Sequence, residues 1–407
     1  MKKEVFLHIG MHKTGSSSIQ ASLNKYHAHG IRYADLGPAN HSEPLLTAFL
    51  QHPEKYHIHI KNGRSKDQIR DIKEKALLLL VRELSRSDCE RLIISGEGLS
   101  SLSFKELIVF KEVLSRFSEK ITVIAYIRDP VSYMSSDFQE AVKGGYSGSE
   151  LPLPCYREKF EKFFRVFGRK NINFRLFNKK SLVNGSVVSD FCELINIPHT
   201  SVVEKSSNES ISLDAVKLMY LFNKKGVMSL GEEKILRARK KMVMLISDIS
   251  DEKFLIPENI CQAYIDVPDL QWMEQQTGFS LYKYAATPDS VAKQSVFEWF
   301  EAFMSSYSEH AVNFLKDLLQ KNQWSVGLND NILILMNKLY YHSLTSGSVF
   351  VLDSYVGKLV KIFDSLRGSP DIHHESMMAL LDLALCIRPE GKILQNKRAD
   401  FLKKGIR

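Results

Sequence analysis

The stretch EVFLHIGMHKTGSSSIQ, residues 4–20, decides how the rest of the chain is interpreted. Its first seven residues form a short apolar run, which is typical of a buried strand. The residues after it favour a helix, because Ile19 and Leu23 are four positions apart. Gly10 and Gly15 enclose the loop between the two segments. A strand, a glycine loop and a helix in this order predict the first unit of a parallel α/β sheet.

The glycine loop departs from the Walker pattern, in which a lysine directly follows the second glycine. Gly10 and Gly15 have the Walker separation, but Ser16 follows the second glycine and Lys13 lies two positions before it. A loop with this order of residues needs a ligand other than the γ-phosphate of a nucleoside triphosphate.

The residues around the second glycine predict an anion site, since the N-terminus of a helix offers unpaired amides and a positive dipole end. Gly15 lets the backbone approach a phosphate, and Ser16, Ser17 and Ser18 add amides and hydroxyls. Lys13 is placed to neutralise charge on a bridging or leaving oxygen. The alternative is an ordinary strand-to-helix turn with capping serines, and the Lys-Thr-Gly-Ser-Ser cluster after an apolar strand argues against it.

The composition is that of an ordinary globular protein, with 407 residues, 44% hydrophobic and 25% charged. The 55 Lys and Arg exceed the 47 Asp and Glu by 8, a modest basic excess that suits an anionic ligand, and no nucleic-acid partner is expected. Five scattered cysteines suggest neither a disulfide framework nor a zinc site. The longest apolar stretch, residues 76–81, is far below the ~20 residues of a membrane span. We therefore expect a cytoplasmic protein without a membrane span.

Apolar strands and amphipathic helices alternate after the glycine loop. Strands are expected at 91–95, 121–127 and 171–177, and helices at 66–86, 104–117, 134–142, 158–168 and 187–197. From about residue 206 the strand signals stop. We predict an α/β domain over residues 1–287, with a P-loop-like parallel sheet flanked by helices, and an all-helical domain over 288–407. The last helices of the chain resemble a tetratricopeptide unit.

A second motif, YIRDPVSYMSSDF at 126–138, follows one of the expected strands. Arg128 ends the strand, and Ser136 lies eight positions later near the start of the next helix. An arginine at a strand end and a serine at a helix start can grip a second phosphate. Because ligands bind at the carboxyl ends of parallel strands, both motifs should face one crevice. Alternatively, Arg128 makes a structural ion pair with Asp129 or Glu97.

The two motifs together resemble those of sulfotransferases that use 3′-phosphoadenylyl sulfate (PAPS). HKTGSSSIQ is similar to their 5′-phosphosulfate loop, and RDPVSYMSS is similar to their 3′-phosphate motif, with Arg and Ser at the family's spacing. The chain is more similar to the bacterial, carbohydrate-type branch than to the cytosolic aryl and steroid enzymes, whose loop carries a Trp where Ile19 and Gln20 stand here. The resemblance covers roughly residues 1–285 and implies the sulfotransferase fold.

The resemblance implies a role for each residue of the motifs. Lys13 would contact the oxygen that joins phosphate and sulfate and assist its departure. Thr14, Gly15, Ser16, Ser17 and Ser18 complete the loop that holds the 5′-phosphate side of PAPS, and Arg128 and Ser136 would bind the 3′-phosphate. The implied reaction moves a sulfuryl group to a hydroxyl, on a carbohydrate or glycan precursor, and leaves adenosine 3′,5′-bisphosphate (PAP). No metal is expected, because a sulfuryl group carries less charge than a phosphoryl group.

Transfer to a hydroxyl also needs a base in line with the departing oxygen. Glu97 is the first candidate, because it lies just past a buried strand in LIISGEGLSSL and carbohydrate-type relatives use a glutamate in a comparable place. His41, in the turn-rich stretch GPANHSEPL, is the rival, since cytosolic relatives use a histidine base. Glu97 could instead cap a helix, and His41 could only contact the acceptor.

Two other functions are compatible with the motifs. One is a small-molecule kinase, which needs a lysine after the second glycine, and that lysine is absent. The other is a non-catalytic scaffold with a degenerate nucleotide site, against which Lys13, Arg128 and Ser136 argue. The helical C-terminal domain is expected to serve as a docking or dimerisation surface. Asn208 and Ser210 are candidates for closing over the nucleotide or for an N-cap.

Overall fold

The computed structural model describes residues 3–205, 210–226, 232–282, 293–324, 326–327, 330–345, 352–367, 374–387 and 391–404. The expected domain boundary at 287/288 and Asn208 lie outside these residues.

The chain forms two compact units. The first comprises Met1–Met134, Leu153–Glu209 and Tyr264–Thr287; the second comprises Ser135–Pro152, Ser210–Ala263 and Pro288–Arg407. The units are thus interleaved along the chain, whereas the sequence interpretation placed one domain after the other.

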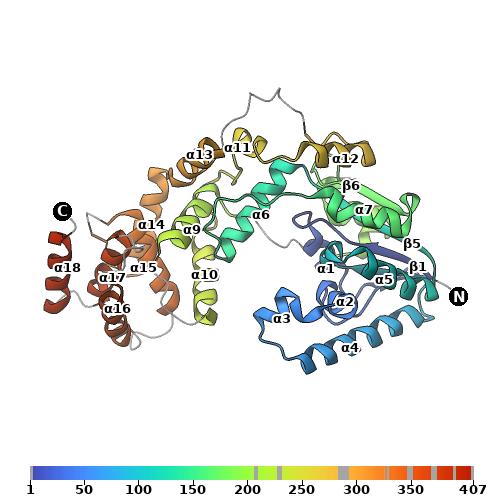
Figure 1. The fold of residues 1–407 in the computed structure, drawn as a ribbon, viewed down its shortest axis with the longest axis horizontal. Helices are drawn as coiled ribbons and strands as arrows, with labels where there is room; N and C mark the ends of the chain where they lie inside the picture. The colour runs from blue at the N-terminus through green and yellow to red at the C-terminus, as the bar shows by residue number, and fades with distance from the viewer. Residues whose placement is uncertain are drawn as a thin grey trace. The chain divides into compact units, whose positions relative to one another are not determined.

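The first unit is built on a six-stranded sheet in the order β2-β3-β4-β1-β5-β6 (Figure 1). The strands are β1 Lys3–His8, β2 His27–Ala28, β3 Ile31–Tyr33, β4 Arg91–Ser95, β5 Ser118–Ile127 and β6 Ile172–Leu176. The β2–β3 pair is antiparallel, and all other neighbours are parallel. The predicted α/β class with a mostly parallel sheet is confirmed. Strand β1 lies between β4 and β5, so the loops after these three strands emerge at one edge of the sheet.

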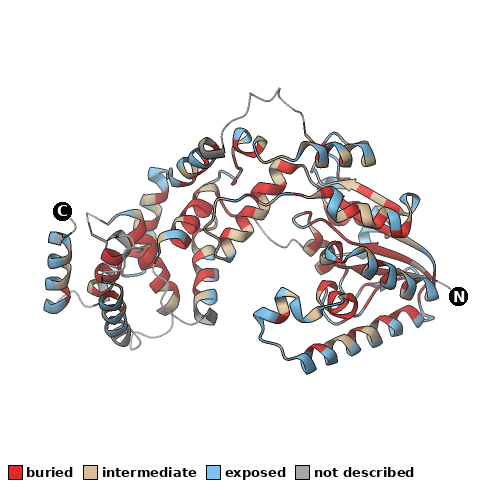
Figure 2. Ribbon diagram, in the orientation of Figure 1, coloured by how far each residue is buried: buried red, intermediate tan, exposed pale blue. Residues whose placement is uncertain are grey.

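Helices cover both faces of this sheet. The α-helices of the first unit are α1 Ser16–Leu23, α2 Ser42–Phe49, α3 His57–Lys61, α4 Lys66–Ser85, α5 Phe104–Phe117, α7 Tyr156–Phe167, α8 Val187–Leu194 and α12 Val267–Thr277. The 3-10 helices are η1 Pro53–Lys55, η2 Glu97–Ser101, η3 Arg169–Asn171, η4 Val183–Gly185 and η5 His199–Ser201. Side chains of β1 alternate between two buried clusters: Val5 and Leu7 pack with residues of α2, α4, α5 and α7, and Phe6 packs with residues of α1 and α8. Strands β1 and β4, at the centre of the sheet, are buried along most of their length (Figure 2).

Local signals explain where several helices begin. Ser65 and Ser103 each form a capping box, with Gln68 and Glu106 respectively, at the starts of α4 and α5. Helix α6 (Pro130–Gly144) begins with its proline, because the fixed φ of proline suits the first helical position.

The sequence interpretation missed four elements, namely β2, β3, α2 and α3. Helix α1 ends at Leu23 and the chain then turns into the β2–β3 hairpin, with Lys25 and His29 at positive φ. Helix α2 begins within residues 37–45, which were interpreted as turn-rich, and α3 follows it at residues 57–61. His41 consequently directly precedes a helix instead of lying in a long loop.

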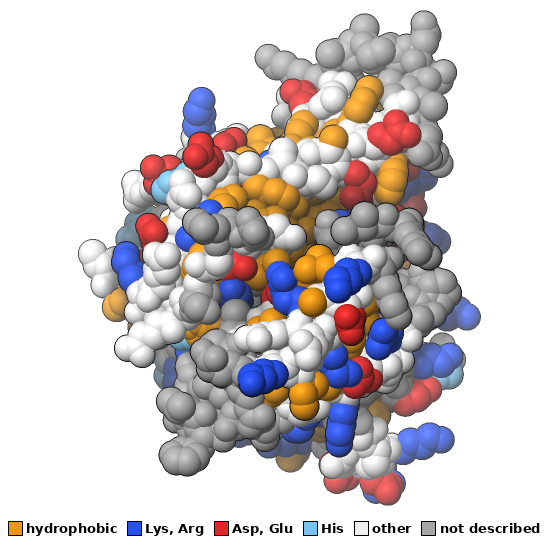
Figure 3. Space-filling view, turned by 90° about the vertical axis from the view of Figure 1, so that its left-hand side faces the viewer, with side chains coloured by type: hydrophobic (Ala, Val, Ile, Leu, Met, Phe, Trp, Pro, Cys, Tyr) orange, Lys and Arg blue, Asp and Glu red, His pale blue; other side chains and the backbone are white. Residues whose placement is uncertain are grey.

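The second unit is helical in its described residues. Besides most of α6, it contains α9 Leu213–Lys225, α10 Glu232–Ile246, α11 Glu258–Gln262, α13 Lys293–Ser305, α14 Glu309–Lys321, α15 Ile332–Thr345, α16 Leu352–Leu366, α17 His374–Ile387 and α18 Lys392–Lys404. An aromatic cluster forms part of its core: the ring centroid of Phe138 lies 6.0 Å from that of Tyr220 and 5.3 Å from that of Phe300. On the face drawn in Figure 3, basic side chains are scattered among acidic and apolar ones. No described helix has the length and apolar character that crossing a membrane requires.

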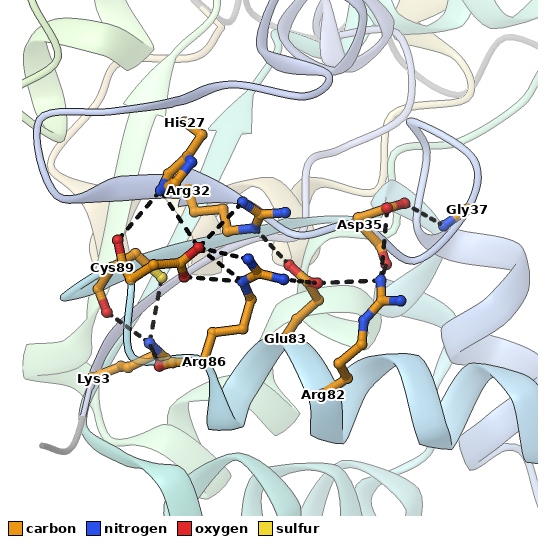
Figure 4. A network of polar contacts seen from close by, with 10 residues as sticks. Lys3, His27, Arg32, Asp35, Gly37, Arg82, Glu83, Arg86 and Cys89 are labelled. Atoms are coloured by element: carbon orange, nitrogen blue, oxygen red, sulfur yellow. Dashed lines mark hydrogen bonds and ion pairs between the residues drawn. The ribbon is translucent and has the colours of Figure 1, made fainter.

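A polar network lies at the edge of the sheet where the parallel strands begin, away from the glycine loop (Figure 4). The fully buried Glu83 of α4 accepts a hydrogen bond from Arg32 Nε at 2.9 Å. Arg86 donates three hydrogen bonds to Asp88 and keeps the pKa of that carboxyl below its usual range. The buried ammonium of Lys3 donates to the carbonyl of Cys89 at 2.6 Å. These contacts fix the C-terminus of α4 to strands β1 and β3.

Candidate active site

The glycine loop winds tightly between β1 and α1. Gly10, Lys13 and Gly15 have φ angles of 49°, 67° and 78°, all in the left-handed region. Glycine adopts this conformation freely, whereas a lysine does so only when its surroundings hold it there. The loop is therefore held in shape by contacts around Lys13.

Contacts inside and beside the loop supply this restraint. Thr14 is fully buried, and its hydroxyl donates to the carbonyl of Met11 at 2.5 Å. A Cβ at Gly15 would lie 2.7 Å from Cγ1 of Val187 and 3.2 Å from the ring of Phe177. Thr14 therefore stabilises the loop from within, and Gly15 is required for its close approach to neighbouring side chains.

Ser16 combines burial with an unpaired hydroxyl. Its side chain is 2% exposed, and its Oγ has no hydrogen-bond partner in the described structure. Helix α1 has no side-chain cap, and Ser18 N bonds back to the carbonyl of Gly15 at 3.0 Å. Ser17 and Ser18 are half-buried. An unpaired buried hydroxyl at a helix N-terminus fits an anionic oxygen as its partner.

Arg128, at the carboxyl end of β5, contacts the loop directly. Its Nη1 donates to the carbonyl of Lys13 at 2.7 Å, and its Nε donates to Ser132 Oγ at 2.9 Å. Burial lowers the pKa of Arg128, and the nearby Asp129 opposes this shift. The structure thus places the Arg128 guanidinium against the backbone of Lys13. No contact between Arg128 and Glu97 is found among the described residues.

Ser136, the other residue of the second motif, lies on α6 in the part of the helix that belongs to the second unit. It is half-buried. Gln139 and Lys143 lie further along α6. Gln139 is 4% exposed, and Lys143 pairs with Glu140 at 2.5 Å.

Glu97 begins η2, directly after β4, and stands against the glycine loop. A Cβ placed on Gly10 would lie 3.3 Å from Cβ of Glu97. The Glu97 side chain is 19% exposed and lines a pocket of 880 Å³. This pocket opens within the first unit, and its volume is in the range of small-molecule sites. Glu97 is therefore both next to the loop and accessible to a ligand.

The pocket contains several titratable groups and an apolar floor. Its titratable side chains are His12, Glu43, His52, Lys55, Tyr56, His57, Glu97 and Glu106. Leu46 and Leu50 of α2 and its C-cap contribute apolar surface. Burial raises the pKa of Tyr56 to about 12, with further contributions from Glu43 and Glu97. Its phenol therefore stays protonated at neutral pH.

Two side chains lie next to the Glu97 carboxylate, and one of them forms a hydrogen bond with it. Asn40 Nδ2 donates to Oε1 at 3.3 Å, and His12 Nδ1 lies 3.9 Å from Oε2. Asn40 is itself fixed, because its Oδ1 accepts from Ser42 N at 2.9 Å and from Ser42 Oγ at 2.6 Å. The backbone amide can only donate, so Oδ1 faces Ser42 and Nδ2 faces Glu97.

His41 lies behind this pocket, not in its lining. It is fully buried, and its Nδ1 accepts a hydrogen bond from Ser95 N at 3.1 Å. Burial lowers the pKa of His41 to about 4, against opposing effects of the Ala34 carbonyl and Asp35. Further buried polar contacts involve the same serine: Ser95 Oγ lies 2.8 Å from His8 Nδ1 and 3.2 Å from Gln20 Nε2. Burial lowers the pKa of His8 to about 3.

The arrangement can bind an anion on the loop and accept a proton beside it. Ser16, Lys13 and the N-terminus of α1 supply the anion site, and Glu97 supplies a carboxylate that faces a pocket. Among the described residues, no group of three or more His, Cys, Asp or Glu side chains is placed to hold a metal ion. The sequence interpretation did not single out Asn40, and it gave His12 no role. Asn40 adjoins the quoted His41, but its partner is 57 residues away.

Comparisons with known proteins give limited similarity. No protein-family model matches the chain. Over 127 residues, the chain is 24% identical to an uncharacterized protein from Archaeoglobus fulgidus; these residues are 30% of this chain and 35% of that protein. The chain thus spans about a third of the length of that relative. A crystal structure of a sulfotransferase from Alicyclobacillus acidocaldarius aligns with a TM-score of 0.34 and 14% identity, over 60% of this chain and 96% of that one. None of these values assigns the chain to a family.

Proposed function

We propose that the chain transfers a sulfuryl group from PAPS to a hydroxyl of a carbohydrate or glycan precursor. The observation that carries the proposal is the glycine loop, in which Lys13 precedes the second glycine and the buried Ser16 hydroxyl has no partner in the described structure. A lysine at this position is suited to a bridging oxygen, and the loop carries no lysine for a γ-phosphate.

In the proposed complex, the loop holds the 5′-phosphate side of the donor. Thr14 maintains the loop, Gly15 allows close approach, and the N-terminus of α1 with Ser16, Ser17 and Ser18 faces the phosphate oxygens. Arg128 binds the 3′-phosphate together with Ser136. A guanidinium has five N–H donors, of which Arg128 uses one for Lys13 and one for Ser132. No metal takes part in the proposed reaction.

Glu97 is the proposed base, and the 880 Å³ pocket is the proposed acceptor site. The acceptor hydroxyl gives its proton to Glu97 while its oxygen forms a bond to sulfur. The bond between sulfur and the bridging oxygen breaks, and Lys13 stabilises the charge that this oxygen gains in PAP. His41 is less suitable, because it is fully buried and its Nδ1 is already occupied by the Ser95 amide.

Isothermal titration calorimetry tests the donor. We expect PAP to bind at least tenfold more tightly than ADP or ATP, with and without Mg²⁺, because only PAP carries the separate 3′-phosphate. Ser16→Ala should weaken PAP binding by about tenfold to a hundredfold, as expected for a hydrogen bond to a charged group. A preference for ATP, or Mg²⁺-dependent binding, would contradict the proposal and favour a kinase.

A further inference from the structure

Asn40 donates a hydrogen bond to one oxygen of the Glu97 carboxylate, and His12 Nδ1 lies 3.9 Å from the other. Glu97 is the first residue of a short 3-10 helix, and its side chain is neither at a protein surface nor in a packed core. A carboxylate in such a position rotates unless its oxygens are held, and a base must be aligned to within fractions of an ångström.

The restraint on Asn40 comes from the start of α2. Ser42 donates both its amide and its hydroxyl to Asn40 Oδ1, and the Ser42 hydroxyl accepts from Gly98 N at 2.9 Å. Gly98 directly follows Glu97 in the chain. A closed set of hydrogen bonds therefore joins the loop before α2 to the backbone beside Glu97 and to its side chain.

Proximity of backbones supports the same connection. A Cβ at Gly96 would lie 3.1 Å from Ser42 N, and a Cβ at Gly98 would lie 3.0 Å from Ser42 Cβ. Any larger residue at these positions would push the two segments apart. Glycines on both sides of Glu97 thus permit the close approach on which the Asn40 contact depends.

We propose that Asn40 is a positioning residue for Glu97, and that its hydrogen bond keeps the carboxylate directed at the acceptor pocket. The inference rests on the proposed function only in giving Glu97 the role of base. Asn40 also lines the pocket, and the role proposed for it is exercised through its hydrogen bond to Glu97. The other titratable groups facing the pocket are His52, His57, Lys55, Tyr56, Glu43 and Glu106.

Two variants separate positioning from folding. Asn40→Asp keeps an oxygen for Ser42, so α2 retains its start, but it replaces the donor to Glu97 with a second carboxylate. Two neighbouring carboxylates oppose each other's ionisation. We expect the acid limb of the kcat/KM profile to move to higher pH by about one unit, with the far-UV circular dichroism spectrum and the PAP affinity unchanged. Asn40→Ala should lower kcat by about tenfold to a hundredfold.

A titration that needs no substrate tests the inference even if the chain transfers another group. With ¹³C-labelled glutamate, and Glu97→Gln to assign the signal, NMR gives the titration midpoint of Glu97. We expect a higher midpoint in Asn40→Asp than in the unaltered chain. Equal midpoints would overturn the role of Asn40. A shifted midpoint in a chain that neither binds PAP nor transfers sulfuryl would overturn the proposed function and leave the positioning role standing.

Discussion

Lys13 shows how much depends on one residue and its conformation. Its φ is 67°, and its backbone carbonyl accepts a hydrogen bond from Arg128. We propose that its ammonium stabilises the negative charge on the leaving oxygen. Because that charge develops in the transition state, removal of the ammonium should affect the rate far more than the affinity for the product.

We expect Lys13→Ala to lower kcat by about a hundredfold to a thousandfold, while the Kd for PAP changes by less than fivefold. Steady-state kinetics and calorimetry measure the two quantities. Lys25→Ala is the matched control, because Lys25 also has a φ of 67° but is exposed beyond the end of α1. Full turnover in Lys13→Ala would show that the lysine has another role.

At the residue scale, the sequence predicts the loop and Arg128 but not the surroundings of Glu97. Glycine spacing and a strand end can be read from neighbouring residues. The contact between Asn40 and Glu97 depends on the pairing of β3 with β4, which brings residues 33 and 93 side by side. Such pairing is not encoded in any local pattern. His41 drew more attention than Asn40 because of its chemistry, and burial places it behind the pocket.

At the scale of elements, the junction of the loop and α1 depends on Gly15. A side chain there would meet Val187 at 2.7 Å and would also force an L-residue to a φ of 78°. Gly63 has a comparable φ of 59°, but nothing lies within 4 Å of its Cβ position. Substitutions at Gly15 and Gly63 therefore distinguish the cost of steric crowding, which only Gly15 has, from the cost of backbone strain, which both have.

Gly15→Ala should lower the free energy of unfolding by about 2–5 kcal/mol, the sum of backbone strain and overpacking. Gly63→Ala should cost about 1–2 kcal/mol, from strain alone. Urea unfolding followed by circular dichroism measures both. Equal losses in the two variants would mean that Val187 moves aside without cost.

Elements with strong local signals were predictable. Strand β4 and helix α5 match their expected ranges, because an apolar run and a capping box mark their limits. The β2–β3 hairpin was missed, since its strands have two and three residues and leave almost no periodicity. Helix α2 was missed because glycine, proline and asparagine precede it and favour an interpretation as turns.

At the scale of the whole molecule, buried neutral histidines tie stability to pH. Burial lowers the pKa of His41 to about 4 and that of His8 to about 3, whereas both return to about 6.5 in the unfolded chain. Below pH 6.5, the unfolded chain therefore binds protons that the folded chain does not. Stability is fully present above pH 6.5 and is lost as the pH falls from 6.5 towards 4.

We expect the free energy of unfolding to fall in this range by up to about 1.4 kcal/mol per pH unit for each histidine. His41→Asn should reduce the slope of the free energy of unfolding against pH by the contribution of one proton, although the variant is less stable at neutral pH. Urea unfolding at several pH values measures the slope. The control is His57→Asn, which removes an imidazole that is exposed in the folded chain. An unchanged slope in His41→Asn would contradict the assignment.

The interleaving of the two units has a consequence for how the chain is made. A ribosome releases Ser135–Pro152 and Ser210–Ala263 well before Pro288–Arg407, which belongs to the same unit. In the folded protein the ring centroids of Phe222 and Tyr340 are 5.1 Å apart. Phe222 cannot make this contact before the segment that contains Tyr340 has been synthesised. The first unit also waits for Tyr264–Thr287. The segments made first in each unit therefore leave apolar surface unburied until the last segment of that unit has been synthesised.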